Sequence, residues 1–232
     1  MNGEIDLKLS EFLKGKKGGA VLFEPYISKH NTETLIWRRG HELWDCAEHY
    51  FFTQVSLAER CLSDCVILDL EFFGGSGDKE KLIHLTASAD YADKEFCVIC
   101  TNRDESELCE RMNAKESARV AVLGLYRNAA HQRTPSVRMD GTIEEAVERG
   151  ENGYFVRSDV RGCIEKYGNE ILLLGGLGTE FISLSKPAAI YAEIDTVFRM
   201  SGGRWAVGSG GKIPTDDYLQ LISLLSAYIR LK

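Results

Sequence analysis

The sequence has no apolar run that approaches the roughly 20 residues needed to span a bilayer. It also lacks an excess of positive charge, since its formal net charge is −7 at pH 7. A negative chain repels the phosphate backbone, which argues against a general nucleic-acid binder. We therefore expect a soluble protein whose partners include neither membranes nor nucleic acid.

The cysteines lack the pattern of a disulfide framework. There are seven, an odd number, at irregular positions, and no secretory signal precedes them. This pattern predicts reduced thiols in a cytoplasmic protein. Cys97 and Cys100 form a C-x-x-C spacing, but they lie inside a predicted strand and so point to opposite faces. Core packing is therefore favoured over a zinc or redox site.

The motifs of nucleotide-binding enzymes are missing as well. No G-x-G-x-x-G opens a helix after the first predicted strand, and there is no P-loop. The chain does have enough apolar residues, 44% of 232, to fill the core of one large α/β domain spanning residues 1–232.

Short apolar runs alternate with helical patterns along the chain, which is typical of parallel strands joined by right-handed crossovers. Five predicted strands are AVLF (20–23), CVILDLEFF (65–73), EFCVICTN (95–102), ARVAVLGLY (118–126) and GYFVRSD (153–159). Two more are the apolar runs that open ILLLGGLGTEF and RWAVGSGGKIP and end in glycines. This rhythm favours a single (β/α)8-type barrel of seven or eight strands, with an open doubly wound sheet as the alternative. Residues 79–93 fit either a helix or an additional strand.

Helix starts are marked by capping residues. Capping boxes are predicted at Asp45–Glu48 and Thr142–Glu145, and single caps at Ser185 and Thr215. The last two strands end in glycines, and parallel sheets bind ligands at the carboxyl ends of their strands. The loops 175–180 and 208–214 are therefore predicted to border a site.

Two segments carry a resemblance to a known family: RRGHELWDCAEHYFFTQVSLAERCLSDCVILDLEFF, and YGNEILLLGGLGTEF followed by RWAVGSGGKIPTDDYLQLISLLSAYIR. In order and spacing they resemble the second strand and the last two strands of the uroporphyrinogen decarboxylase superfamily. The resemblance covers about half of the chain. It implies a single (β/α)8 barrel, and either cofactor-free tetrapyrrole decarboxylation or zinc-dependent methyl transfer between corrinoids and small thiols.

The sequence departs from both chemistries of that superfamily. Where decarboxylases carry M-R-Q-A-G-R, this chain reads FEPYISKH, with Glu24 near the first arginine position. Decarboxylases have G-H-G after the last strand and methyltransferases G-C-G, whereas this chain has Gly208-Ser209-Gly210. The loop that supplies a His and a Cys in the methyltransferases reads FVRSD here. We therefore expect no stoichiometric zinc, no cofactor and no turnover of uroporphyrinogen.

Asp69 and Glu71 are the candidate catalytic residues, because they lie two apart on the second strand and share one face. By the resemblance, Glu71 falls where decarboxylases place the carboxylate that contacts the pyrrole nitrogens. Two like charges partly shielded from water raise one pKa, which suits a proton shuttle or a cation site. A salt bridge at the barrel rim is the alternative.

Cationic and glycine-rich segments are the candidate substrate-binding elements. Arg38 is a candidate anion clamp or part of a surface pair with Arg39. Arg127 and His131 follow the fourth strand, where they face an anionic ligand or lie in a solvated loop. Ser209, Gly210 and Lys212 belong to a G-S-G-G-K segment that either cradles an anion with backbone N–H groups or serves the turn alone.

These features predict a divergent, metal-free lyase-type enzyme acting on a small or tetrapyrrole-like anionic substrate. A methyltransferase relative with altered metal ligands is one alternative, and a non-catalytic ligand-binding protein is another. The expected partner is a small molecule, and a homodimer is compatible with the sequence.

Overall fold

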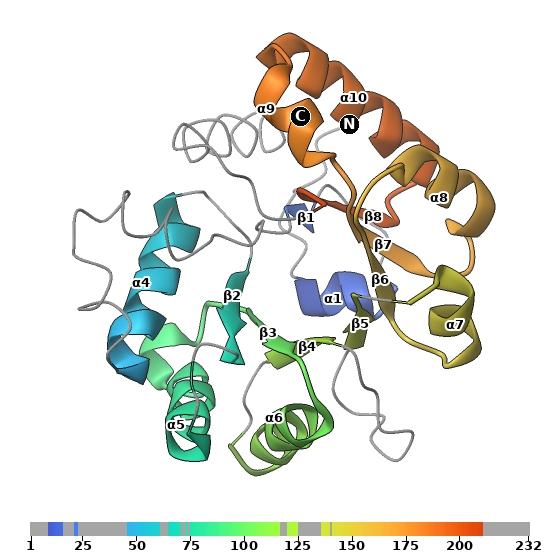
Figure 1. Cartoon of the computed structure of the whole chain (residues 1–232). Helices are drawn as coiled ribbons and strands as arrows, with labels where there is room; N and C mark the ends of the chain where they lie inside the picture. Colours follow the sequence, from blue (N-terminus) through green and yellow to red (C-terminus); the bar gives the residue numbers. More distant parts are fainter. Residues whose placement is uncertain are drawn as a thin grey trace.

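The computed structural model contains a sheet of eight parallel strands that curls around a central axis (Figure 1). It describes residues 9–15, 21–22, 46–60, 65–70, 73, 75–116, 120–124, 136–139 and 141–210. The strands are β1 (Val21–Leu22), β2 (Val66–Asp69), β3 (Phe96–Cys100), β4 (Val120–Gly124), β5 (Ser136–Arg138), β6 (Gly153–Val156), β7 (Leu172–Gly175) and β8 (Trp205–Val207).

The strand order confirms the predicted α/β barrel fold. Along the sheet the order is β1-β8-β7-β6-β5-β4-β3-β2, and every hydrogen-bonded neighbour is parallel. Each strand from β2 to β7 pairs with the next in the chain, and β1 pairs with β8 at the far edge. This is the cyclic order of a (β/α)8 barrel.

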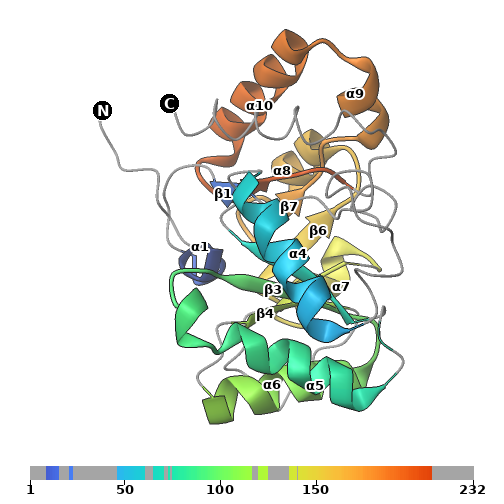
Figure 2. The same ribbon diagram turned by 90° about the vertical axis from the view of Figure 1, so that its left-hand side faces the viewer.

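The helices lie outside the curled sheet, apart from α1, which lies within the ring in Figure 1. Figure 2 shows α4 crossing in front of the strands, with α5 and α6 below it and α10 above. The helices are α1 (Leu9–Leu13), α4 (Ala47–Arg60), α5 (Ser76–Thr86), the 3-10 helix η2 (Ala89–Tyr91), α6 (Arg103–Glu116), α7 (Ile143–Glu148), α8 (Val160–Tyr167), α9 (Thr179–Leu184) and α10 (Pro187–Ser201).

The interior of the barrel is a packed apolar cluster. Alternate strand residues point inward, and α1 covers them from one end. This inner cluster consists of Leu9, Phe12, Leu13, Cys65, Ile67, Cys97, Ala121, Val137, Phe155, Leu172, Leu174 and Ala206. The Asn152 side chain, just before β6, donates to the Leu13 carbonyl at 3.2 Å. The helix α1 therefore closes the amino-terminal end of the barrel, which leaves the carboxyl ends of the strands for a site.

Two further apolar clusters fill the space between strands and helices. One joins β2 and β3 to α4, α5 and α6 around Phe51, Leu68 and Phe96. The other joins β6, β7 and β8 to the helices from α7 to α10 around Ile190 and Trp205. Because strands in a parallel sheet are buried on both faces, their sequences are continuous apolar runs, which made them recognisable.

One strand was not predicted. Residues Ser136–Arg138 form β5, whereas the sequence assigned them to a loop. Only Val137 of its three residues is apolar, so no run or alternation marks the segment. Its backbone pairs with β4 on one side and β6 on the other, and these neighbours make it a strand. The ambiguous stretch 79–93 is helical, forming most of α5 and the turn η2.

The predicted caps have mixed outcomes. The Thr142–Glu145 capping box is confirmed: the Glu145 N–H donates to Thr142 Oγ1 at 3.2 Å, and the Thr142 N–H donates to Glu145 Oε2 at 3.3 Å. Ser185 as a helix N-cap is wrong, because a short helix, α9, ends there and Lys186 precedes α10. Pro187 starts α10 instead, as its fixed φ and missing N–H favour the first helical position. Asp45 and Thr215 lie outside the described residues.

Candidate functional site

Asp69 ends β2 at the carboxyl ends of the barrel strands, and only 3% of its surface is exposed. Ile67 belongs to the inner cluster, whereas Val66, Leu68 and Leu70 pack with the surrounding helices. Because side chains alternate along a strand, Asp69 follows Ile67 on the inner face. Its expected partner Glu71 lies outside the described residues.

The backbone of Asp69 is tied to α4. The Val66 N–H donates to the Glu95 carbonyl on the β3 side at 2.8 Å. Successive backbone N–H groups of a strand point to opposite sides. The Asp69 N–H, three residues later, therefore points away from β3. It donates to the hydroxyl oxygen of Tyr50 at 2.7 Å. A side chain from α4 therefore satisfies this backbone group at the edge of β2.

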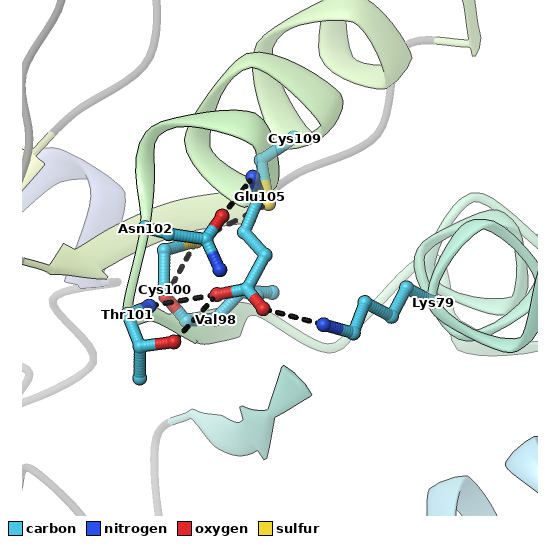
Figure 3. Close-up of polar contacts among 7 residues, drawn as sticks. All are labelled: Lys79, Val98, Cys100, Thr101, Asn102, Glu105 and Cys109. Atoms are coloured by element: carbon cyan, nitrogen blue, oxygen red, sulfur yellow. Dashed lines mark hydrogen bonds and ion pairs between the residues drawn. The ribbon is translucent and has the colours of Figure 1, made fainter. Parts of the chain in front are cut away.

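A buried carboxylate organises the carboxyl end of β3 (Figure 3). Glu105, which is 3% exposed, accepts hydrogen bonds from the Thr101 N–H at 2.7 Å and from the Thr101 hydroxyl at 3.2 Å. Its other oxygen binds the Lys79 ammonium of α5 at 2.6 Å. The Glu105 N–H donates to Asn102 Oδ1 at 3.0 Å, as expected of an N-cap asparagine. One side chain thus joins β3, α5 and α6.

Glu105 is ionised at neutral pH. Burial acts to raise its pKa, but the hydrogen bonds from Lys79 and Thr101 and the charge of Lys79 outweigh burial, so the pKa is lowered. The sequence alone gave no reason to select Glu105. One sequence feature could have identified the start of this helix: Asn102 and Glu105 have the three-residue spacing of a capping box.

A pair of thiols lies beneath this carboxylate. Cys100 at the end of β3 and Cys109 on α6 have their sulfur atoms 3.7 Å apart, and both side chains are buried. Cys97 lies in the inner cluster and Cys100 in the outer one, so the predicted opposite orientation of the C-x-x-C pair is confirmed. The thiol contact with Cys109, burial, and the negative charges of Glu105 and Asp69 raise the pKa of Cys100 well above its usual range.

We expect Cys100 to resist alkylation in the native protein. The thiolate is the reactive form, and both a raised pKa and burial suppress it, so iodoacetamide should modify Cys100 at least about tenfold more slowly than the partly exposed Cys46. Peptide mass spectrometry after timed quenching measures both rates in one sample. In urea the two rates should converge. Equal rates in the native state would contradict the described burial of the pair.

The loop after β8 is held by backbone pairing with the loop after β7. The Leu177 N–H donates to the Gly208 carbonyl at 3.1 Å, and the Gly210 N–H donates to the Leu177 carbonyl at 2.8 Å. Ser209 is only 1% exposed. The Gly210 N–H, which the sequence offered as part of an anion cradle, is therefore engaged by the protein itself. Lys212 lies outside the described residues.

Gly210 also touches the end of β6. A Cβ atom placed on Gly210 would lie 1.6 Å from the carbonyl oxygen of Arg157. The loops after β6 and β8 therefore meet at the open end of the barrel, although β7 lies between the two strands. Arg157 itself is exposed, and its guanidinium donates to the Met139 carbonyl at 3.4 Å. In the sequence, Arg157 is distinguished only as part of the segment FVRSD.

Comparison with known proteins supports the fold. No family model matches the chain, and no curated protein matches it. Among solved structures, a methyltransferase from Methanosarcina mazei is similar over 99% of this chain and 98% of its own, with 12% identity and a TM-score of 0.67. An archaeal fructose-1,6-bisphosphate aldolase is similar over 92% of this chain and 94% of its own, with 11% identity and a TM-score of 0.49. At 12% identity, the likeness to the methyltransferase structure shows a shared barrel fold and nothing about activity.

The structure places three of the predicted site residues. Asp69, Ser209 and Gly210 all lie at the carboxyl ends of strands, whereas Arg38, Arg127, His131 and Glu71 lie outside the described residues. Within the described part of the chain, no three His, Cys, Asp or Glu side chains are grouped to hold a metal ion. In the same part, no helix has the length and apolar character needed to cross a membrane.

Proposed function

We propose that this chain is a divergent barrel enzyme of the uroporphyrinogen decarboxylase type. It acts on a small or tetrapyrrole-like anionic substrate by lyase-type chemistry, and it is not a true uroporphyrinogen decarboxylase. The similarity to a methyltransferase barrel over nearly the whole of both chains supports the fold side of this proposal. The sequence departures at Glu24 and Ser209 support a substrate other than uroporphyrinogen.

The observation that carries the proposal is the position of Asp69. It ends β2 at the open end of the barrel, follows Ile67 on the inner face and is 3% exposed. Keeping a charged carboxylate out of water is costly, so such a group favours proton exchange or a cationic partner. In barrels of this class the carboxyl ends of the strands carry the catalytic residues.

The proposed step is a decarboxylation in which Asp69, with Glu71, acts as the acid–base group. The bond between the substrate carbon and its carboxylate breaks, carbon dioxide leaves, and the electron pair stays on the carbon. The carboxylic acid form of Asp69 then donates a proton to that carbon. Arg38, Arg127, His131 and Lys212 are the proposed anion-binding residues around it, with Ser209 and Gly210 bordering the site.

Methyl transfer is the second candidate, because the similar full-length barrel is a methyltransferase. The methyltransferases of the resembled superfamily use zinc held by His and Cys side chains. At the corresponding positions this chain has the segment 155–159, which contains neither residue, and Ser209, which is a poor ligand for zinc. The residues present do not fit that metal, so we derive no step through it.

The experiment that tests the proposal is a turnover screen with matched variants. Carbon dioxide release from small polycarboxylic acids and porphyrinogens should detect a substrate, while uroporphyrinogen should not be converted. Asp69→Asn should lower kcat on that substrate by about 10²-fold or more, as expected for loss of an acid–base group. Asp93→Asn, at an exposed position, should leave kcat unchanged.

Four outcomes would contradict the proposal. Conversion of uroporphyrinogen would mean that the chain is a true decarboxylase. Methyl transfer from methylcobalamin to a small thiol, together with about one zinc per chain by elemental analysis, would favour the second candidate. Ligand binding without any turnover, or full activity of Asp69→Asn, would favour a non-catalytic binding protein or a different catalytic group.

A further inference from the structure

Arg157 lies at the open end of the barrel, directly after β6. Phe155 of the same strand belongs to the inner cluster, whereas Val156 packs outward against the helices. Alternation therefore turns the next side chain, that of Arg157, toward the barrel axis. Its guanidinium reaches the carbonyl oxygen of Met139 at the end of the neighbouring strand β5, at 3.4 Å. Met139 in turn packs against the inner cluster. The exposed guanidinium thus lies beside the end of β5, at the carboxyl ends of the strands.

The guanidinium of Arg157 has no carboxylate partner within the described part of the chain. Four other described arginines do have one: Arg103 with Glu107, Arg111 with Glu80, Arg138 with Glu145 and Arg161 with Glu193. The nearest carboxylate along the chain, Asp159, caps α8 by accepting the Gly162 N–H at 3.2 Å. Arg157 therefore keeps most of its donors available for a ligand.

The backbone of Arg157 is firmly placed. Its carbonyl lies against Gly210, whose own N–H is fixed by Leu177. Two residues later, Asp159 adopts the left-handed conformation at φ 52° and starts α8. A binding residue held on both sides in this way needs little rearrangement when a ligand arrives.

We propose that Arg157 binds the anionic group of the substrate. The ligand class is a carboxylate or a phosphate, because a guanidinium donates two parallel hydrogen bonds to a pair of anionic oxygens. In the strand order, β6 lies four steps from β2 (β2-β3-β4-β5-β6), which is half of an eight-strand ring. The substrate is therefore held by its anionic end at β6, while Asp69 acts on it from the opposite wall. This inference rests on the proposed function.

The test is an anion titration observed at the arginine itself. In the 15N-labelled full chain, Arg157→Gln removes one Nε–Hε resonance and so assigns it. Citrate and inorganic phosphate serve as the carboxylate and phosphate probes. We expect at least one of them to shift this resonance in the wild type, and its affinity to fall about ten- to hundredfold in Arg157→Gln, as for loss of a charged hydrogen bond. Arg157→Lys should give an intermediate affinity.

The matched control is Arg199→Gln, which removes the same charge from an exposed position on α10. It should bind the probes like the wild type. Equal affinity of Arg157→Gln and wild type, or no shift of the Arg157 resonance with either probe, would overturn the inference. Anion binding at Arg157 without any turnover would support Arg157 as an anion site and contradict the proposed enzymatic function. Turnover with an unchanged KM in Arg157→Gln would contradict the role of Arg157 and leave the proposed function intact.

Discussion

Glu105→Gln should lower the free energy of unfolding by about 2–3 kcal/mol, because it removes one partner of a buried ion pair. Lys79 would then face an amide, and its side chain is only 18% exposed. The hydrogen bonds from Thr101 that end β3 would lose their charged acceptor. Urea unfolding followed by circular dichroism at pH 7 measures the change.

Glu107→Gln is the matched control on the same helix. Glu107 pairs with Arg103 on the exposed surface, and such pairs contribute about 0–1 kcal/mol. The Glu105 effect should also depend on pH. Its pKa is lowered in the folded state, so its stabilisation is complete above the unfolded value of about 4.3 and is lost as pH falls through the folded value. A loss at pH 7 no larger than that of Glu107→Gln would contradict the described network.

Gly210→Ala is expected to be similarly disruptive, for a steric reason. Its Cβ would lie 1.6 Å from the carbonyl oxygen of Arg157 and 2.4 Å from the carbonyl carbon. Both atoms belong to the backbone, so no side-chain rotation relieves the overlap. We expect a loss of about 2–3 kcal/mol in unfolding free energy, in the range of overpacked sites. The anion affinity of Arg157 should fall with it, because the two loops must move apart.

The control for this substitution is Gly77→Ala in α5. No atom lies within 4 Å of a Cβ at Gly77, and alanine is the better helix former. This variant should be as stable as the wild type or slightly more stable. Urea unfolding and the citrate titration together distinguish the two glycines. Wild-type stability and affinity in Gly210→Ala would show that the loops after β6 and β8 do not meet as described.

The strands were predictable because burial on both faces leaves a local mark. Runs such as LLLG in β7 and FCVIC in β3 are continuous apolar segments, and their glycine or polar ends mark where they stop. The same locality made the Thr142–Glu145 capping box recognisable, since its two hydrogen bonds join residues three apart. The assignment of Asp69 to the inner face also followed from alternation alone.

The strand β5 and the polar contacts of the site were not predictable in this way. Ser136–Arg138 is a strand because β4 and β6 flank it. Cys100 meets Cys109 because α6 packs back on β3, and Lys79 reaches Glu105 only because α5 lies beside α6. The residues around each of these side chains form no motif that identifies its partner, so the sequence does not predict either contact.

The sequence by itself therefore determined the alternation of strands and helices, and it favoured a barrel over an open doubly wound sheet without deciding between them. These depend on periodicity and on turn residues, which act over a few neighbours. Only the tertiary structure decided that Gly210 lies against Arg157, that Glu105 is buried on Lys79 and that β6 stands opposite β2. Those relations arise because the sheet curls and the helices pack on it, which brings together residues that are far apart in the chain.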